Sequence, residues 1–328
     1  MTRRVCLFHS KDLDGHCSGA LVKMAYPETE LVGIDYADGK NAEMLIRKHN
    51  LADAEVWMVD FSLQPFVEML KLVEGCKKLI WCDHHKSAIE EYKKSSSLYN
   101  GEFERYIDPN YKSNNPQNLS AGCELTFKAL EQNPRIGEKI PPRFVKLLGR
   151  FDVWDHTDQD VIPFQYGMRE VETNPCKLDW SYNSRNIWQA LIYNHQMGES
   201  YLMIEKINCG KTILSYVAKD NKGLSKSSWF LCHVGDLKCM AVNKLGGNSQ
   251  VFDAVWNPEE YDAMLLFGFN GKMWRVSLYT TKDVDVGAVC KKLGGGGHAK
   301  AAGFTRPDFP FECIGLMGNG RSIMRLIP

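Results

Sequence analysis

Apolar runs of strand length alternate with segments of helical periodicity from residue 1 to about residue 150. The expected strands are Val5–His9, Glu30–Tyr36, Glu55–Asp60, Lys78–Asp83 and Arg105–Asp108. The expected helices between them are Ser18–Met24, Asn41–His49, Pro65–Val73 and Ser87–Lys94. This alternation is typical of a doubly wound, mostly parallel α/β sheet. Because four of the five strands end in an acid or a histidine, polar chemistry is expected at one edge of the sheet.

Helical periodicity continues in the middle of the chain. Three further helical segments are expected: Ser120–Gln132, a helix running from Pro141-Pro142 toward Asp152, and Ser184–Asp220. Ser120 has the side chain of a typical helix N-cap. The last of the three segments is interpreted as a connector between two domains.

Paired strands replace the helical pattern beyond Lys226. They are expected at Trp229–His233, Lys238–Val242, Ala263–Phe269 and Lys272–Tyr279. Asn270-Gly271 joins the last two and is a strong signal for a tight β-hairpin. We therefore expect a smaller C-terminal α/β domain with a mixed sheet over residues 225–328, a helical connector over 186–224, and an N-terminal domain over 1–185, with the active cleft between the two domains.

Composition narrows the class of protein. The chain has 328 residues, and its 40 Lys plus Arg balance its 40 Asp plus Glu, so there is no overall positive field for binding long nucleic acid. The 11 cysteines form no CxxC pair, which favours reduced thiols and a cytoplasmic protein. No apolar run approaches the length of a membrane span, so neither secretion nor membrane anchoring is expected.

The first candidate chemical group lies where the first strand ends and a helix is expected to begin. His9, Asp12 and Asp14 supply one imidazole and two carboxylates within six residues, and Gly15 permits a tight turn. A solvated loop is the alternative, because Asp-Leu-Asp-Gly is common in turns. Asp60 closes a second buried strand, where it is either a metal ligand or the N-cap of the next helix.

A second group follows the buried strand Leu79–Cys82. Asp83, His84 and His85 are three consecutive ionisable residues beside a core, where metal coordination is a natural way to satisfy them. A further contributor is Asp152, for which Asp155 and His156 are rivals that the spacing does not separate.

The chemistry of this set predicts the metal. Carboxylates with imidazoles suit Mn²⁺ or Mg²⁺ better than the thiolate-rich sites of structural zinc. Two such ions about 3.5–4 Å apart clamp a phosphoryl group and activate water. The pattern therefore indicates a metal-dependent hydrolase.

Four consecutive glycines, Gly294 to Gly297, precede His298 and Lys300 near the C-terminus. Their backbone N–H groups are unobstructed, and the Ala-rich stretch that follows could begin a helix, so an anion cradle is expected with His298 and Lys300 beside it. A flexible linker is the alternative interpretation. Trp154, Trp180 and Trp188 near the expected cleft either stack on bases or pack within the protein.

These segments, in this order, resemble the DHH phosphoesterase superfamily and its DHHA1-bearing branch, over nearly the whole chain. The most specific marks are Asp83-His84-His85 downstream of His9, Asp12 and Asp14, and Gly-Gly-Gly-His at Gly295 to His298. The branch includes nanoRNases, phosphoadenosine-phosphate phosphatases, cyclic-dinucleotide phosphodiesterases and RecJ exonucleases.

The resemblance implies a role for each candidate residue. One metal ion would be held by His9, Asp12 and Asp60, and the second by Asp14, Asp60, His84 and Asp152, with Asp60 bridging. His85 would face the scissile phosphate as a hydrogen-bond donor or an acid. Gly295, Gly296, Gly297 and His298 would hold a terminal phosphate or nucleotide.

Two features depart from the family pattern. His9 and Asp12 are separated by two residues, where many members have three. Many DHHA1 domains carry a phosphate-binding arginine in the strand before the glycine run, near the position of Tyr279 here, and Arg275 is the candidate substitute.

The expected function is hydrolysis of phosphodiester bonds in short oligonucleotides or in cyclic or linear dinucleotides, by two-metal activation of water with Mn²⁺, for which Mg²⁺ or Co²⁺ could substitute. The closest alternative is a nucleotide phosphomonoesterase acting on a substrate such as phosphoadenosine phosphate. A short single-strand exonuclease and a non-catalytic nucleotide-binding module are further alternatives. No membrane partner is expected, and the choice of RNA or DNA and a homodimer are left open.

Overall fold

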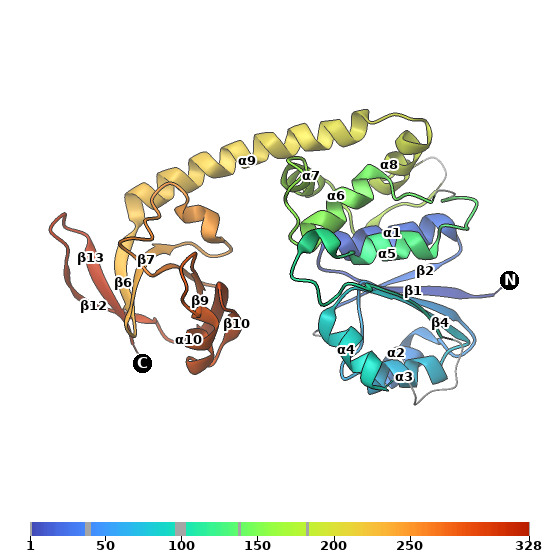
Figure 1. Cartoon of the computed structure of the whole chain (residues 1–328), viewed down its shortest axis with the longest axis horizontal. Helices are drawn as coiled ribbons and strands as arrows, with labels where there is room; N and C mark the ends of the chain where they lie inside the picture. Colours follow the sequence, from blue (N-terminus) through green and yellow to red (C-terminus); the bar gives the residue numbers. More distant parts are fainter. Residues whose placement is uncertain (1, 37–40, 96–102, 137–138, 182–183, 328) are drawn as a thin grey trace. The chain divides into compact units, whose positions relative to one another are not determined.

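The computed structural model describes residues 2–36, 41–95, 103–136, 139–181 and 184–327. The chain divides into two compact units, Met1–Ile213 and Leu214–Pro328 (Figure 1). Each unit has its own sheet and its own hydrophobic core.

The first unit contains a five-stranded sheet in which every neighbouring pair is parallel, in the order β2-β1-β3-β4-β5. Its strands are β1 (Arg4–His9), β2 (Glu30–Ile34), β3 (Glu55–Val59), β4 (Lys78–Asp83) and β5 (Phe103–Ile107). The predicted parallel α/β sheet is thus confirmed. All five predicted strands are present, with small shifts at their ends: β2 stops at Ile34 and β5 already begins at Phe103.

Helices cover both faces of this sheet (Figure 1). One face carries α1 (Leu13–Ala25), α5 (Gly122–Ala129), α6 (Arg143–Asp152), α7 (Val161–Met168) and α8 (Ile187–Gln196), and the other carries α2 (Ala42–His49), α3 (Val67–Glu74) and α4 (Lys86–Ser95). Alternation along β1 explains both layers, because Cys6 and Phe8 enter one core while Val5 and Leu7 enter the other. Short 3₁₀ helices occur at Pro116–Asn118 and Pro175–Lys177.

Several helix limits differ from the prediction. The helix α1 begins at Leu13, before Ser18, because the Asp12 side chain accepts the Gly15 N–H and caps it. The helix predicted for Ser120–Gln132 is shorter and begins after Ala121. The helical stretch expected at Ser184–Asp220 consists of two helices: α8 ends at Gln196, and Gly198 adopts a left-handed φ of 71° before the next helix begins.

The helix α9 (Tyr201–Ser228) is 28 residues long and contributes its first half to the first unit. Glycines permit its close packing there: a β-carbon on Gly210 would lie 1.7 Å from the carbonyl oxygen of Pro163 in α7. No helix in the described ranges combines the length and apolar content required to cross a membrane.

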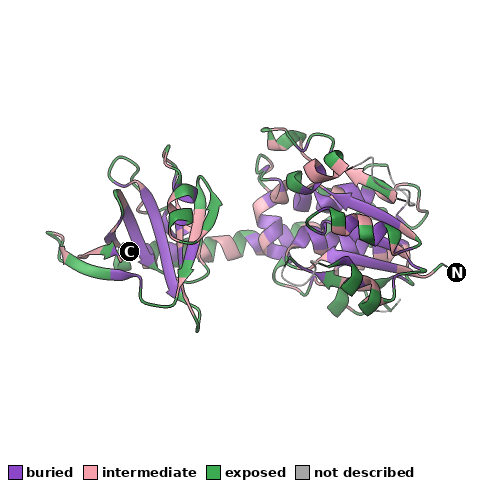
Figure 2. Ribbon diagram, turned by 90° about the horizontal axis from the view of Figure 1, so that it is seen from below, coloured by how far each residue is buried: buried purple, intermediate pink, exposed green. Residues whose placement is uncertain are grey.

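The second unit is built on an eight-stranded mixed sheet in the order β10-β11-β9-β8-β7-β6-β13-β12. The strands are β6 (Phe230–Val234), β7 (Leu237–Asn243), β8 (Ala263–Phe269), β9 (Trp274–Tyr279), β10 (Gly296–His298), β11 (Ala301–Arg306), β12 (Phe311–Leu316) and β13 (Ser322–Leu326). The helix α10 (Val286–Lys292) and a 3₁₀ helix (Ser249–Phe252) pack with them. Figure 2 shows that the central strands are mostly buried. The predicted mixed α/β domain is therefore confirmed.

The local signals in this unit had different outcomes. The predicted hairpin at Asn270-Gly271 is confirmed: Gly271 has a φ of 92°, and the Asn270 side chain accepts the N–H groups of Lys272 and Met273. The helix expected after the glycine run is wrong. That segment is strand β11, which pairs with β9 on one side and with β10 on the other.

Candidate metal centre

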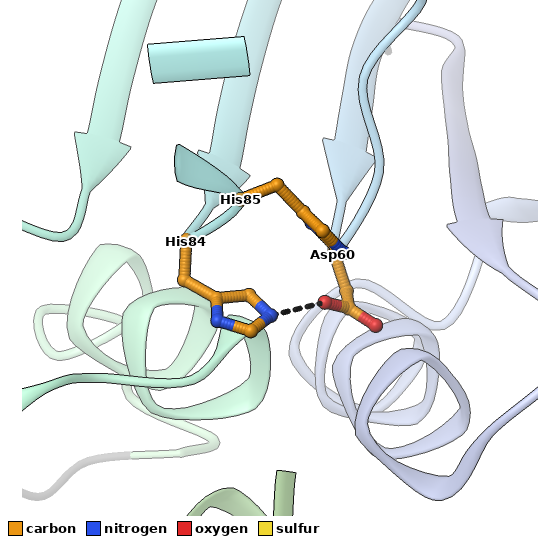
Figure 3. A group of neighbouring side chains, drawn as sticks. All are labelled: Asp60, His84 and His85. Atoms are coloured by element: carbon orange, nitrogen blue, oxygen red, sulfur yellow. Dashed lines mark ion pairs between the residues drawn. The ribbon is translucent and has the colours of Figure 1, made fainter. Parts of the chain in front are cut away.

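The three adjacent strands β1, β3 and β4 carry the central residues of the site. Since these strands are parallel and neighbours in the sheet, their carboxyl ends meet at one edge and bring His9, Asp60 and His84 together. Figure 3 shows Asp60 and His84 directed toward each other from neighbouring strand ends. Asp60 has a left-handed backbone with a φ of 53°, a conformation that Asp tolerates better than most residues.

A first group of candidate ligands consists of His9, Asp12 and Asp60. The Nδ1 atom of His9 lies 2.7 Å from Oδ2 of Asp12 and 3.7 Å from Oδ2 of Asp60. The other oxygen of Asp12 accepts the N–H of Gly15 at 2.9 Å. A β-carbon on Gly15 would lie 2.0 Å from the carbonyl oxygen of His9, so this turn requires glycine.

A second group consists of Asp14, His84 and Asp152, with Asp60 beside it. The Nε2 atom of His84 lies 3.2 Å from Oδ2 of Asp152, 3.3 Å from Oδ1 of Asp60 and 3.9 Å from Oδ2 of Asp14. Asp60 therefore directs one carboxylate oxygen to His84 and the other to His9. This shared carboxylate links the two groups.

Two residues that sequence reasoning missed hold Asp14 in place. The backbone N–H groups of Gly122 and Cys123, at the start of α5, each donate to the Asp14 carboxylate at 2.7 Å. Gly122 also leaves room for Asp60, because a β-carbon on it would lie 2.6 Å from the Asp60 Cβ. A glycine in the first turn of a helix was the only local signal for this role.

The structure distinguishes the three rivals at the end of α6. Asp152 lies at the cluster, whereas the Asp155 carboxylate accepts hydrogen bonds from the N–H and Oγ1 of Thr157 and lies 3.7 Å from Arg150. His156 is exposed, and its ring lies 5.4 Å from that of Phe151. Of the three, only Asp152 reaches His84 in this structure.

Asp83 and His85 form a separate pair beside the cluster. The Oδ1 atom of the fully buried Asp83 lies 2.6 Å from Nδ1 of His85 and also accepts the backbone N–H groups of His84 and His85. The sequence placed Asp83 with its two neighbours as a possible ligand, but its carboxylate instead orients His85. His85 also belongs to a compact group with Asp60 and His84.

A further residue that sequence reasoning missed is Tyr36, which follows β2. Its ring lies 4.6 Å from the Phe61 ring, 5.6 Å from the His9 ring and 6.2 Å from the His85 ring. Burial and the nearby carboxylates raise the pKa of its phenol, so the hydroxyl remains protonated at neutral pH. The only sequence signal was its place at the end of a predicted strand.

The electrostatics of the cluster favour a bound cation. Burial and the charge of Asp60 raise the pKa of Asp14 well above its usual value, and burial and the charge of Asp14 raise the pKa of Asp152 to about 7. Burial lowers the pKa of His9, but Asp12 and Asp60 outweigh it and raise the value to about 10. For His84, Asp60 and Asp152 likewise outweigh burial and raise the pKa.

Two buried nitrogen atoms test whether a cation fits. Nδ1 of His9 and Nε2 of His84 lie close to carboxylates, yet the direction of approach gives neither a hydrogen bond within the described residues. Buried polar atoms normally have partners. Imidazole nitrogens and carboxylate oxygens that converge without hydrogen bonding are a donor set suited to divalent cations. The residues present therefore fit a metal centre.

The glycine run lies beside a pocket in the second unit. This pocket has a volume of about 580 Å³, and its lining includes Arg275, Ser277, Tyr279, Gly295 and Gly296. A neighbouring pocket of about 250 Å³ shares the side chains of β9 and adds Lys244, Gly246 and Gly247. Ser277 was missed by sequence reasoning, although the alternation of β9 places it on the same face as Arg275 and Tyr279.

The other predicted substrate-binding residues lie outside this lining. Gly297 and His298 belong to β10 and are exposed. The ammonium group of Lys300 donates to the carbonyl oxygen of Lys282 and lies 3.9 Å from Asp283. The structure thus places Arg275, Gly295 and Gly296 in the lining of the pocket. Gly297, His298 and Lys300 are not part of that lining.

Comparison with known proteins gives matches to both parts of the chain. Residues 245–312 match the model of the DHHA1 domain. Oligoribonuclease NrnB of Bacillus subtilis is 21% identical over 327 residues, covering 93% of this chain and 74% of that protein. The structure of the DHH domain of a protein assigned to a family of ribosomal proteins aligns with a TM-score of 0.50 at 14% identity, covering 93% of this chain and 83% of that one.

A further similar structure is the pGpG-specific phosphodiesterase PggH of Vibrio cholerae, with a TM-score of 0.49 at 11% identity, covering 93% of this chain and 94% of that one. The DHHA1 match, the similarity to NrnB and the five-stranded parallel and eight-stranded mixed sheets agree with one another. Residues 245–312 thus match the DHHA1 domain, and over most of its length the chain is similar to the DHH/DHHA1 phosphoesterase superfamily.

Proposed function

We propose that this protein is a Mn²⁺-dependent phosphodiesterase that hydrolyses short oligonucleotides or cyclic or linear dinucleotides. The observation that carries the proposal is the shared carboxylate of Asp60, with Oδ1 3.3 Å from His84 and Oδ2 3.7 Å from His9. A carboxylate between two groups of acidic and imidazole ligands is the arrangement that a two-metal phosphoryl-transfer site needs.

The candidate ligands divide between two ions. His9, Asp12 and Asp60 would hold one ion, and Asp14, Asp60, His84 and Asp152 the other. Mn²⁺ is proposed because the set combines oxygen with imidazole nitrogen, and Mg²⁺ or Co²⁺ are proposed as substitutes. Such ions supply the Lewis acidity that activates water and neutralises charge on phosphate oxygens.

The protein's own groups would act around the reacting phosphate. The Asp83 carboxylate accepts a hydrogen bond from Nδ1 of His85, which leaves Nε2 of that ring for the substrate. A donor held in this way stabilises charge that develops on the leaving oxygen or gives it a proton. Gly122 and Cys123 keep the buried Asp14 carboxylate in place through their N–H groups.

The pocket in the second unit supports a nucleotide substrate of limited size. Its volume of about 580 Å³ falls within the range of small-ligand sites. Arg275 supplies a guanidinium group suited to phosphate, and Gly295 and Gly296 supply backbone without side chains. The balanced charge of 40 basic and 40 acidic residues favours a short substrate over a long polymer. Similarity to an oligoribonuclease supports the same substrate class.

A substrate panel tests the proposal. With Mn²⁺, end-labelled dinucleotides should give two mononucleotides, and a cyclic dinucleotide should be opened or cleaved. Release of orthophosphate from a nucleoside 3′,5′-bisphosphate without dinucleotide cleavage would identify a phosphomonoesterase instead. Stepwise shortening of longer single strands at a higher rate than dinucleotides would identify an exonuclease. Nucleotide binding without turnover of any substrate would identify a binding module.

A further inference from the structure

Trp154 is unusually exposed for its size. It lies two residues after the candidate ligand Asp152, and its relative exposure is 79%. Its backbone has a φ of 62°, in the left-handed region that favours glycine. A bulky residue with such a φ is a rare outlier.

The hydrogen bonds around Trp154 explain this backbone. The N–H of Trp154 donates to the carbonyl oxygen of Phe151 at 3.2 Å, and the N–H of Asp155 donates to that of Arg150 at 2.8 Å. These bonds close the end of α6 as a Schellman motif, with Trp154 at the position where glycine is most common. Glycine would therefore fit the backbone at this position, whereas the backbone of a tryptophan is strained there.

Packing does not compensate for this strain, because most of the side chain is exposed to solvent. Three other non-glycine residues in the described ranges have a positive φ: Asn50, Asp60 and Arg185. Asn50 ends a helix in a conformation that asparagine tolerates, and Asp60 belongs to the metal centre. Strain retained without a packing benefit is a feature of functional positions.

The surroundings of Trp154 are aromatic and cationic. Its ring lies 5.6 Å from the ring of His156, which lies 5.4 Å from that of Phe151. The guanidinium carbon of Arg169 lies 6.0 Å from the centre of the Phe151 ring. The Cα of Trp154 can be at most about 7.6 Å from the Cα of Asp152, because consecutive Cα atoms are about 3.8 Å apart. An exposed indole thus begins close to the candidate ligand Asp152, and its neighbours Phe151 and His156 are aromatic.

We infer that Trp154 is a stacking platform for a nucleobase of the substrate, next to the phosphate handled by the metal centre. This inference rests on the proposed function and adds a specificity-determining residue to it. A base is the occupant that fits, because every base offers a π-face to an exposed indole and stacking does not depend on sequence. The hydrogen-bonded turn at the end of α6 fixes the position of the Trp154 backbone, from which the indole extends.

The structure offers a variant that removes the ring and relieves the strain. Trp154→Gly should have an unchanged or higher melting temperature, because glycine prefers this backbone conformation. Its kcat/KM for a dinucleotide with Mn²⁺ should fall by about tenfold or more, mainly through KM. Trp154→Phe should recover most of the loss. On a dinucleotide analogue that lacks one base, wild type and Trp154→Gly should differ by less than about threefold.

Tyr193→Ala is the matched control, because Tyr193 is 51% exposed on α8 of the same unit. It should leave the kinetics unchanged. An equal loss in both variants, or an equal loss by Trp154→Gly on the base-free analogue, would overturn the inference. A change of oligomeric state in Trp154→Gly with unchanged KM would also overturn it, and would assign the indole to contact with a second copy.

Binding separates this inference from the proposed function. If the wild type cleaves no phosphodiester, the affinities of the wild type and Trp154→Gly for a dinucleotide can still be compared by calorimetric titration. Binding at least about tenfold weaker in Trp154→Gly would then support the platform while the proposed reaction fails. Equal affinity in the two proteins, or no binding by the wild type, would refute the platform.

Discussion

The carboxylate of Asp83 and the imidazole of His85 are joined by a 2.6 Å contact between Oδ1 and Nδ1. The same oxygen accepts the backbone N–H groups of His84 and His85, so one buried atom holds both the turn and the ring. Burial raises the pKa of Asp83, but the charge of His85 and these hydrogen bonds outweigh it and lower the pKa below its usual value. Asp83 is therefore ionised at neutral pH and favours a proton on Nδ1 of His85.

Asp83→Asn should lower kcat by about 10²–10⁴-fold while the bound Mn²⁺ remains. The amide matches the carboxylate in shape and its oxygen can still accept from Nδ1, but it lacks the negative charge that outweighs burial and raises the pKa of His85 to about 9, so the ring holds its proton less well. Steady-state kinetics with elemental analysis of the bound metal test this. The double variant Asp83→Asn/His85→Ala should be no slower than His85→Ala alone. An additive loss would show that Asp83 does not act through His85.

Asp60→Asn should reduce Mn²⁺ binding at both proposed ion positions, because the Asp60 oxygens face the two groups separately. Asparagine tolerates the left-handed backbone that residue 60 adopts, so the fold should survive. Asp12→Asn is the matched comparison, since Asp12 contacts only the first group, and it should weaken one ion more than the other. Equilibrium dialysis counts the ions, and circular dichroism checks the fold. Two ions bound with wild-type affinity in Asp60→Asn would rule out the bridging role.

The sequence predicted the parts of this site that depend on strand ends. His9, Asp60 and His84 follow buried apolar runs, and parallel strands necessarily bring their carboxyl ends to one edge. It could not predict the N–H groups of Gly122 and Cys123, because their contacts with Asp14 span 108 and 109 residues and depend on how α5 packs.

The remaining differences have local causes. Spacing alone did not separate Asp152 from Asp155, because the choice depends on the Schellman turn that directs Asp155 to Thr157 and Arg150. The short Ala-rich stretch Ala299–Ala302 favours a helix by local propensity, but the pairing of β11 with β9 and β10 outweighs it. The same pairing holds Gly297 and His298 in an exposed strand outside the pocket lining.

Arg275→Ala should raise KM for a dinucleotide by about tenfold or more with little change in kcat, because a charged hydrogen bond to phosphate contributes about 1.5–3 kcal/mol. Arg275 lines the pocket beside the glycine run and the neighbouring pocket of about 250 Å³, and it lies outside the metal centre. Arg325→Ala is the control, because Arg325 is exposed and paired with Glu312 on β12, outside the lining of those pockets. Steady-state kinetics on the same substrate should give this control the KM of the wild type. Equal KM values for the wild type and both variants would show that Arg275 does not bind the substrate.

Metal binding should release protons and strengthen as pH rises. The raised pKa of Asp152, about 7, and of His9, about 10, mean that both groups carry protons in the metal-free protein below those values. A cation needs the deprotonated forms, so binding must displace these protons. Between pH 6 and 8 the affinity for Mn²⁺ should increase at least about tenfold.

Calorimetry in buffers of different ionisation enthalpy counts the protons released. Asp152→Asn should release fewer of them near pH 7 than the wild type. An affinity independent of pH over this range would mean that the cluster does not bind the ion.

Gly122→Ala should weaken Mn²⁺ binding and activity even though the substitution adds one methyl group. Its β-carbon would lie 2.6 Å from Cβ and 2.7 Å from Oδ1 of Asp60, closer than real β-carbons approach other atoms. Either Asp60 or the start of α5 must shift, and a shift of α5 also moves the N–H groups that hold Asp14. Overpacking of this kind costs about 1–3 kcal/mol, so a lower melting temperature should accompany the loss of metal affinity.

Gly223→Ala is the matched control for this substitution, because Gly223 lies within α9 and its β-carbon would meet no atom within 4 Å. That variant should be as stable as the wild type or up to about 1 kcal/mol more stable, since alanine favours helices. Denaturation and Mn²⁺ titration of both variants test the difference. A Gly122→Ala protein with wild-type affinity would show that Asp60 has room to move, and its carboxylate would then not be fixed between the two groups by the start of α5.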